Sequence, residues 1–137
     1  MNDFAIFLLR SISGAFMLFA HGLPKLNRLF SSGEITFSDP LGIGTIPSLA
    51  LAVFSEFFCS ILLILGLLTR ASLIPLIITM FVAAFIHHSG DPFLQIEKAL
   101  LFLLIFVVLF LTGPGKFALG RVVKIKSANK MIKYLFE

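Results

Sequence analysis

Four long apolar stretches divide this chain, and they constrain its fold more than any other feature of the sequence. They occupy roughly residues 4–22, 46–68, 71–87 and 96–112. An α-helix needs about 20 predominantly apolar residues to cross the hydrocarbon core of a bilayer. Only 13% of the residues are charged, whereas a soluble domain has about 25%. The sequence therefore predicts an all-α, polytopic membrane protein built as a bundle of four transmembrane helices.

The segments between these stretches contain residues that end or interrupt helices. Gly22-Leu23-Pro24 is predicted to end or kink the first helix, and residues 31–47 are predicted as a loop with at most short ordered pieces. Thr69-Arg70 indicates a tight connection, Ser89-Gly90-Asp91-Pro92 a turn, and Gly113-Pro114-Gly115 the end of the last helix. We expect a four-helix domain over residues 1–120, followed by a tail.

Lysine and arginine are distributed unequally between the two ends of the predicted bundle. One end has Arg70, Lys116, Arg121, Lys124, Lys126, Lys130 and Lys133. The other end has Lys25, Arg28 and Lys98. Because basic segments next to membrane helices stay in the cytoplasm, the sequence predicts cytoplasmic N- and C-termini in a bacterial inner membrane. The first helix lacks a positively charged leader, so we expect it to be retained rather than cleaved as a signal peptide.

The tail over residues 121–137 has the spacing of an amphipathic helix. Its apolar positions are Val122, Ile125, Ile132 and Phe136, and its basic positions include Lys126, Lys130 and Lys133. Such a helix lies among anionic lipid headgroups, where each basic residue contributes about 1 kcal/mol. We therefore interpret the formal charge of +4 as a membrane-surface feature, with no nucleic-acid partner expected.

Two ionisable residues, Arg10 and Glu56, lie within apolar stretches. A charged side chain at the centre of a membrane helix costs roughly 2.5 to 3.5 kcal/mol on insertion scales, so such residues usually face the bundle interior and mark functional sites. Two interpretations stay open for each residue. Arg10 either belongs to a structural network that fixes helix register or serves the site. Glu56 either exchanges protons or takes part in helix packing.

Helical spacing places further polar residues on the same faces. On the first helix one stripe contains Arg10, Gly14, Met17 and His21. On the second it contains Glu56, Cys59 and Ser60, and on the third Met80, Ala84, His87 and His88. Glu97 opens the fourth helix. If these stripes face each other, the side chains that converge in the outer half of the bundle are His21, Lys25, Glu56, His87 or His88, and Glu97.

Several of these residues also have a simpler interpretation that involves no functional site. Cys59 lies in an apolar run and packs as a small hydrophobic residue. Glu97 suits the positive end of a helix dipole. His87 and His88 point about 100° apart on a helix, and no His-x-x-x-His pair is present, so no metal site is expected. The chain also has no flavin- or haem-attachment motif.

Several motifs, taken in order, resemble the DoxX/DoxD family of small four-helix membrane proteins. They are Arg10, Gly14 and Phe16, His21-Gly22 with Lys25, Glu56, the run from Leu62 to Arg70, Met80 with Ala83, the run from Glu97 to Leu101, and Gly113-Pro114-Gly115. The resemblance extends to Gly120. One departure is that Ala118-Leu119-Gly120 stands where the family often has Ser-Leu-Asp.

The resemblance implies a four-helix bundle linked to membrane redox chemistry, because some relatives are quinone-coupled oxidoreductase subunits and others belong to oxidative-stress systems. The first hypothesis is a quinone-associated subunit of an oxidoreductase. In it, Glu56 and His21 transfer protons. Its pocket would include Arg10, Gly14, Met17, Lys25, Cys59, Met80, His87, His88 and Glu97. A partner redox subunit or a homo-oligomer would accompany it. The alternatives are a non-catalytic membrane scaffold and a small-solute conduit.

Overall fold

In the computed structural model, residues 2–122 and 130–136 are described, and all regular structure among them is helical. The elements are α1 (Asp3–Met17), η1 (Leu18–Gly22), α2 (Leu23–Leu29), α3 (Thr45–Val53), η2 (Phe54–Cys59), α4 (Ser60–Leu65), α5 (Thr69–Val82), η3 (Ala83–His87), α6 (Phe93–Thr112), η4 (Leu119–Arg121) and α7 (Lys130–Phe136). The elements η1, η2 and η3 are π-helical turns, and η4 is a 3₁₀ turn.

These elements join into four rods that are long and apolar enough to cross a membrane. The rods are Asp3–Leu29, Thr45–Leu65, Thr69–His87 and Phe93–Thr112. The prediction of an all-α protein with four transmembrane helices is therefore confirmed. The turn over residues 88–92 lies where the sequence predicts one. The tight connection predicted at Thr69-Arg70 is displaced: the second rod ends at Leu65, the turn occupies residues 66–68, and Thr69 and Arg70 begin α5. The left-handed conformation of Gly66 ends the helix earlier than the apolar run suggests.

The first rod is longer than predicted, because it continues past Gly22 and Pro24 to Leu29. The N–H of Leu23 bonds to the carbonyl of Leu18, five residues back, so the helix widens just before the proline. Pro24 then occupies the first turn of α2. A proline inside a helix removes one backbone hydrogen bond, and the rod nevertheless continues through it to Leu29.

The rods pack as a closed ring in which each contacts its neighbours in sequence and the fourth returns to the first. Without a hydrophobic drive between helices in lipid, close packing and polar contacts hold such a bundle together. Gly14 illustrates this, because a Cβ there would lie 2.8 Å from Ile64 Cγ1 and 3.4 Å from the Ser60 carbonyl. The predicted close approach of a neighbouring helix at Gly14 is confirmed.

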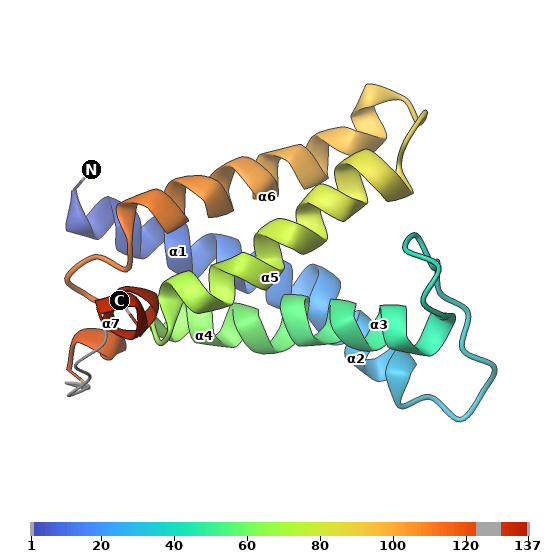
Figure 1. Cartoon of the computed structure of the whole chain (residues 1–137), viewed down its shortest axis with the longest axis horizontal. Helices are drawn as coiled ribbons and strands as arrows, with labels where there is room; N and C mark the ends of the chain where they lie inside the picture. The colour runs from blue at the N-terminus through green and yellow to red at the C-terminus, as the bar shows by residue number, and fades with distance from the viewer. Residues whose placement is uncertain (1, 123–129, 137) are drawn as a thin grey trace.

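Both ends of the chain lie at the same end of the bundle, here called the termini end (Figure 1). Gly66 and Leu68 adopt left-handed backbone conformations there, with φ of 71° and 49°, and form a tight turn between the second and third rods. The opposite end, called the loop end, carries the long loop over residues 30–44 and the turn over residues 88–92.

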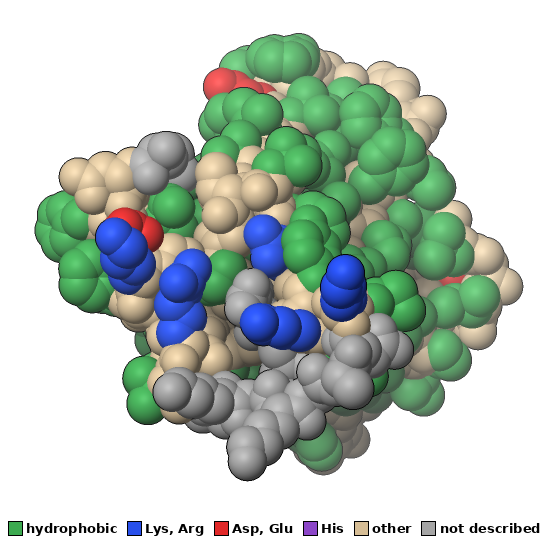
Figure 2. Space-filling view, turned by 60° about the vertical axis from the view of Figure 1, so that its left-hand side comes forward, with side chains coloured by type: hydrophobic (Ala, Val, Ile, Leu, Met, Phe, Trp, Pro, Cys, Tyr) green, Lys and Arg blue, Asp and Glu red, His purple; other side chains and the backbone are tan. Residues whose placement is uncertain are grey.

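Basic side chains gather at the termini end (Figure 2). The exposed lysines and arginines among them are Lys116, Arg121, Lys130 and Lys133. The short helix α7 packs against α5, and the Arg70 guanidinium lies 4.0 Å above the ring of Tyr134. The central part of the predicted amphipathic tail, including Ile125 and Lys126, lies outside the described residues.

Candidate functional site

A cavity of about 760 Å³ opens at the loop end, where the rods diverge (Figure 1). All four rods and the loop over residues 30–44 contribute to its wall. Six of the residues predicted for the site line it: His21, Lys25, Glu56, Met80, His87 and His88. The rest of the wall is mainly apolar, with Leu51, Phe54, Ile78 and Phe102 among its residues. Of the side chains predicted to converge, His21, Lys25, Glu56, His87 and His88 share this wall, whereas Glu97 does not.

Three π-helical turns each carry one ionisable residue of this wall. His21 lies in η1, Glu56 in η2 and His87 in η3. Each π turn places an extra residue in the helix, which shifts the face that later residues present, and such turns are frequent at functional sites. The turns η1 and η2 contact each other, and η2 contacts α5. The wide turns of three rods thus meet around one cavity.

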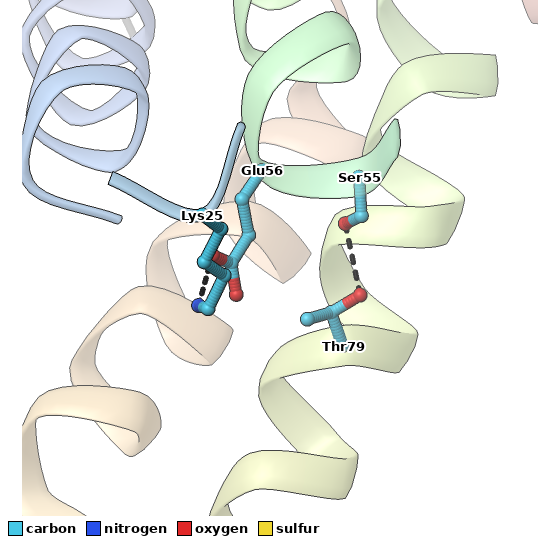
Figure 3. A network of polar contacts seen from close by, with 4 residues as sticks. All are labelled: Lys25, Ser55, Glu56 and Thr79. Carbon is cyan, nitrogen blue, oxygen red and sulfur yellow. Dashed lines mark hydrogen bonds and ion pairs between the residues drawn. The ribbon is translucent and has the colours of Figure 1, made fainter. Parts of the chain in front are cut away.

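Lys25 and Glu56 form an ion pair across the first and second rods (Figure 3). Only 4% of the Glu56 side chain is exposed, against 22% of Lys25. A carboxylate this far from water needs a partner of opposite charge or a proton. Gly22 permits the contact, because a Cβ there would lie 2.8 Å from the Cα of Phe57. Lys25 lies one turn after Gly22 on the first rod, and from there its side chain reaches Glu56 on the second rod.

Next to this pair, Thr79 donates a hydrogen bond of 2.9 Å to the Ser55 hydroxyl (Figure 3). This bond joins the second and third rods on the cavity wall. On the opposite side, the His21 ring meets the edge of Phe102, with ring centroids 5.9 Å apart. His21 is thereby placed between the first and fourth rods.

The adjacent residues His87 and His88 line the cavity near the turn over residues 88–92. Their ring centroids lie 4.5 Å apart at an angle of 65°, and His88 Nδ1 lies 2.7 Å from Asp91 Oδ2. His88 is thus engaged with its own turn. Over residues 2–122 and 130–136, no group of three histidine, cysteine or acidic residues is arranged to hold a metal ion.

Five residues expected in the pocket lie elsewhere: Arg10, Gly14, Met17, Cys59 and Glu97 do not line this cavity. Gly14 faces Ile64, while Met17 and Cys59 belong to the buried core. Glu97 is half-buried beside the cavity. The spacing of the stripes places residues on a common face but does not limit how far along the rod the cavity extends.

Of these five residues, Arg10 lies furthest from the cavity, because it is near the termini end. It is fully buried and donates to the carbonyls of Leu63 at 2.5 Å, Ile64 at 2.6 Å and Phe117 at 3.3 Å. The first two carbonyls belong to the C-terminal turn of α4, where the last backbone oxygens lack the regular helical partner; the Leu63 carbonyl also accepts from the Gly66 N–H at 3.1 Å. Arg10 therefore caps the second rod and fastens the segment that follows the fourth.

Several lining residues are not predicted from the sequence, notably Lys98, Ser48, Ser55, Thr79 and Gln95. In the sequence, Lys98 enters only the charge balance. Its position one turn before the half-buried wall residue Phe102 is the available signal. The small hydroxyl residues carry no distinguishing pattern, since serine and threonine occur throughout apolar helices.

The loop over residues 30–44 is fastened beside the cavity by Asp39. Its carboxylate accepts hydrogen bonds from the Ser48 hydroxyl at 2.7 Å and from the N–H groups of Gly44 and Ile43 at 2.8 and 3.0 Å. The Ser48 hydroxyl, followed by the Gly44 N–H, holds the pKa of Asp39 below its usual value of 3.8. Phe37 from the same loop lines the cavity.

This geometry defines a class of protein: a four-helix membrane bundle with an apolar cavity at one end and a buried ion pair in the cavity wall. Comparison with known families identifies it further, since the DoxX family model matches residues 5–89. The chain belongs to the DoxX family. The match includes both members of the Lys25–Glu56 pair and all three cavity histidines. No curated protein and no solved structure matches the chain.

Proposed function

We propose that this DoxX-family protein is a quinone-associated subunit of a redox or oxidative-stress system in a bacterial inner membrane. The termini end would face the cytoplasm, in accordance with the excess of basic residues there. One observation supports the quinone assignment most: the Lys25–Glu56 ion pair stands in the wall of a mainly apolar cavity of about 760 Å³. Small-molecule sites typically combine an apolar wall with a few placed polar groups.

The residues of the cavity fit a quinone head group. A quinone is a flat apolar ring with two carbonyl oxygens, so it needs an apolar slot and hydrogen-bond donors. Phe54, Ile78 and Phe102 supply apolar wall, and Lys25, Lys98 and the ring of His21 supply N–H donors. A bound quinone takes up two electrons and two protons when it is reduced.

The chain's own part in that reaction would be to hold and move protons. Glu56 and His21 are the proton-transfer residues in this proposal, with Lys25 as the partner that keeps Glu56 charged until a proton is needed. The sequence has no attachment motif for flavin or haem, so the electrons would come from a partner redox subunit.

A non-catalytic scaffold is the second candidate. The Lys25–Glu56 pair and the Ser55–Thr79 bond also join neighbouring rods, as a purely structural network would. The two candidates differ in what Glu56 does when the fold is intact.

The test compares two carboxylates in the same half of the bundle. Purified wild type, Glu56→Gln and Glu97→Gln would be titrated with a quinone in lipid nanodiscs, and their melting temperatures recorded. We expect Glu56→Gln to fold and to lose quinone turnover by about a hundredfold to ten-thousandfold, the range of general acid–base catalysis. Glu97→Gln, which alters a residue outside the cavity wall, should behave as wild type. Absence of quinone binding by the wild type would favour the scaffold.

A further inference from the structure

A second apolar depression, of about 510 Å³, runs between α1 and α6. We call it the α1–α6 groove, and its apolar lining includes Leu8, Ile12, Phe16, Leu101, Phe102 and Ile105. The one hydroxyl among its lining residues, on Ser13, is turned to its own helix and donates to the Leu9 carbonyl at 2.6 Å. The groove therefore presents hydrocarbon almost everywhere, unlike the cavity at the loop end.

The groove and the cavity meet at two shared residues, because Lys98 and Phe102 line both. Phe102 also contacts His21 on the cavity side and Phe106 in the core, with centroid distances of 5.9 and 5.7 Å. The Phe102 ring thus stands between the cavity, with its few polar groups, and the hydrocarbon surface of the groove. Phe102 and Lys98 mark the junction.

The groove leads away from the cavity and toward the termini end. Phe16 on α1 and Lys98 on α6 lie at its cavity end, and Ala5 and Ile105 lie at its far end. From Ala5 to Phe16 the helix advances by eleven residues, which is about 17 Å at 1.5 Å per residue. That direction follows the membrane-spanning rods, as a lipid-like chain in a bilayer would.

Lys98 adds charge at this junction. It is exposed, and within residues 2–122 and 130–136 it makes no ion pair. An ammonium group without a protein partner, placed inside a membrane span, is suited to an oxygen on a bound molecule. The groove below it would then take the apolar remainder of the same molecule.

We infer that the occupant is a long-chain isoprenoid quinone, with its ring in the cavity and its tail in the α1–α6 groove. The inference rests on the proposed function and deepens it. It assigns the groove to the tail, Lys98 to an oxygen of the head group, and Phe102 to the point where the molecule passes from one to the other. The quinone would enter sideways from the bilayer between α1 and α6.

The experiment fills the groove without touching the cavity. Leu101 lines the groove and Leu104 does not, although both are leucines on α6 and both are exposed, by 54% and 61%. Leu101→Trp and Leu104→Trp would be titrated in nanodiscs with a short-chain benzoquinone and with the same head group on a long isoprenoid tail. Since the chain has no native tryptophan, each variant also carries a single fluorophore that a nearby quinone quenches.

We expect Leu101→Trp to weaken binding of the long-chain quinone by about tenfold, the effect of overfilling a packed site, and to leave the short-chain quinone unaffected. Leu104→Trp should change neither. Equal behaviour of the two variants toward the long-chain quinone would overturn the groove assignment while the proposed function stands. A phospholipid chain in the groove would give that same result. If wild type bound quinones of neither length, both proposals would fall.

Discussion

The two ends of this bundle each bury an ionisable side chain, but they surround it in opposite ways. Arg10 at the termini end is fully buried and bonded to three backbone carbonyls, with Gly66 packed against its guanidinium. Glu56 at the loop end is paired with one flexible lysine and faces a large cavity. The charge of Arg10 is bonded to the backbone of the fold, so its role is structural. The charge of Glu56 is held by a side chain beside a cavity, so it can exchange that partner for a ligand.

The first prediction tests which end faces outward and has an all-or-none result. Cys59 is buried, so it should react slowly with a membrane-impermeant maleimide and leave introduced cysteines easy to detect. In intact cells Glu34→Cys, in the loop over residues 30–44, should be labelled. Lys126→Cys in the basic tail should be labelled only after the membrane is permeabilised. The reverse pattern would invert the proposed orientation.

The next largest effect is expected at Arg10. Arg10→Leu removes the donors to Leu63, Ile64 and Phe117 and leaves those carbonyls without these bonds. A buried hydrogen-bonding group left without its partner costs about 1–3 kcal/mol, and here three carbonyls lose a donor at once. We expect most of the folded yield to be lost, measured by size-exclusion chromatography and thermal unfolding in detergent.

Arg28→Leu is the control for charge removal, since Arg28 is exposed and its contact to the Thr36 carbonyl is 3.5 Å long. That variant should unfold at nearly the wild-type temperature. An Arg10→Leu protein as stable as the Arg28→Leu protein would contradict the structural role of Arg10.

A smaller loss is expected from closing the gap between the first two rods. In Gly22→Ala the new Cβ would meet the backbone of Glu56 and Phe57, which cannot move without shifting η2. In Gly14→Ala it would meet the flexible end of Ile64 first. Overpacking costs about 1–3 kcal/mol, so Gly22→Ala should lower the melting temperature and quinone affinity clearly more than Gly14→Ala. Equal effects would mean that the contact at Gly22 does not position the ion pair.

The smallest effect concerns the loop beside the cavity and depends on pH. Folding lowers the pKa of Asp39, chiefly through the Ser48 hydroxyl and then the Gly44 N–H. The carboxylate therefore stabilises the loop at pH values above its usual pKa of 3.8, and this contribution is lost as the pH falls through the lowered value. Amide exchange at Ile43 and Gly44, corrected for intrinsic rates, should accelerate in that acidic range. Asp39→Asn should remove most of this pH dependence, and an unchanged profile would contradict the anchoring role.

The sequence predicts the rods and part of the site for a clear physical reason. Membrane helices must be long and apolar, so their number and approximate ends can be read directly, and a period of 3.6 residues places His21 and Glu56 on inward faces. The extension past Pro24 and the three π turns could not be predicted. Both depend on a shift from four-residue to five-residue hydrogen bonds, which no single residue type marks.

The hydrogen-bond acceptors of Arg10 could not be predicted from the sequence, for a related reason. Its acceptors are backbone carbonyls of Leu63, Ile64 and Phe117, and every residue has a carbonyl. Only the tertiary arrangement shows which carbonyls lie within reach of the Arg10 guanidinium. The Lys25–Glu56 contact was easier to expect, because opposite charges in one half of a bundle are few and need each other.

The central claim is that Glu56 is a responsive group at a ligand site, whereas Arg10 is a fixed structural one. Infrared difference spectroscopy tests it most directly, by comparing the protein with oxidised and reduced quinone in the same nanodiscs. The account predicts a carboxyl band that changes on reduction in wild type and in Glu97→Gln, and that is missing in Glu56→Gln. If the quinone is bound and reduced while that band stays absent in wild type, Glu56 belongs to the packing of the helices and the claim is wrong.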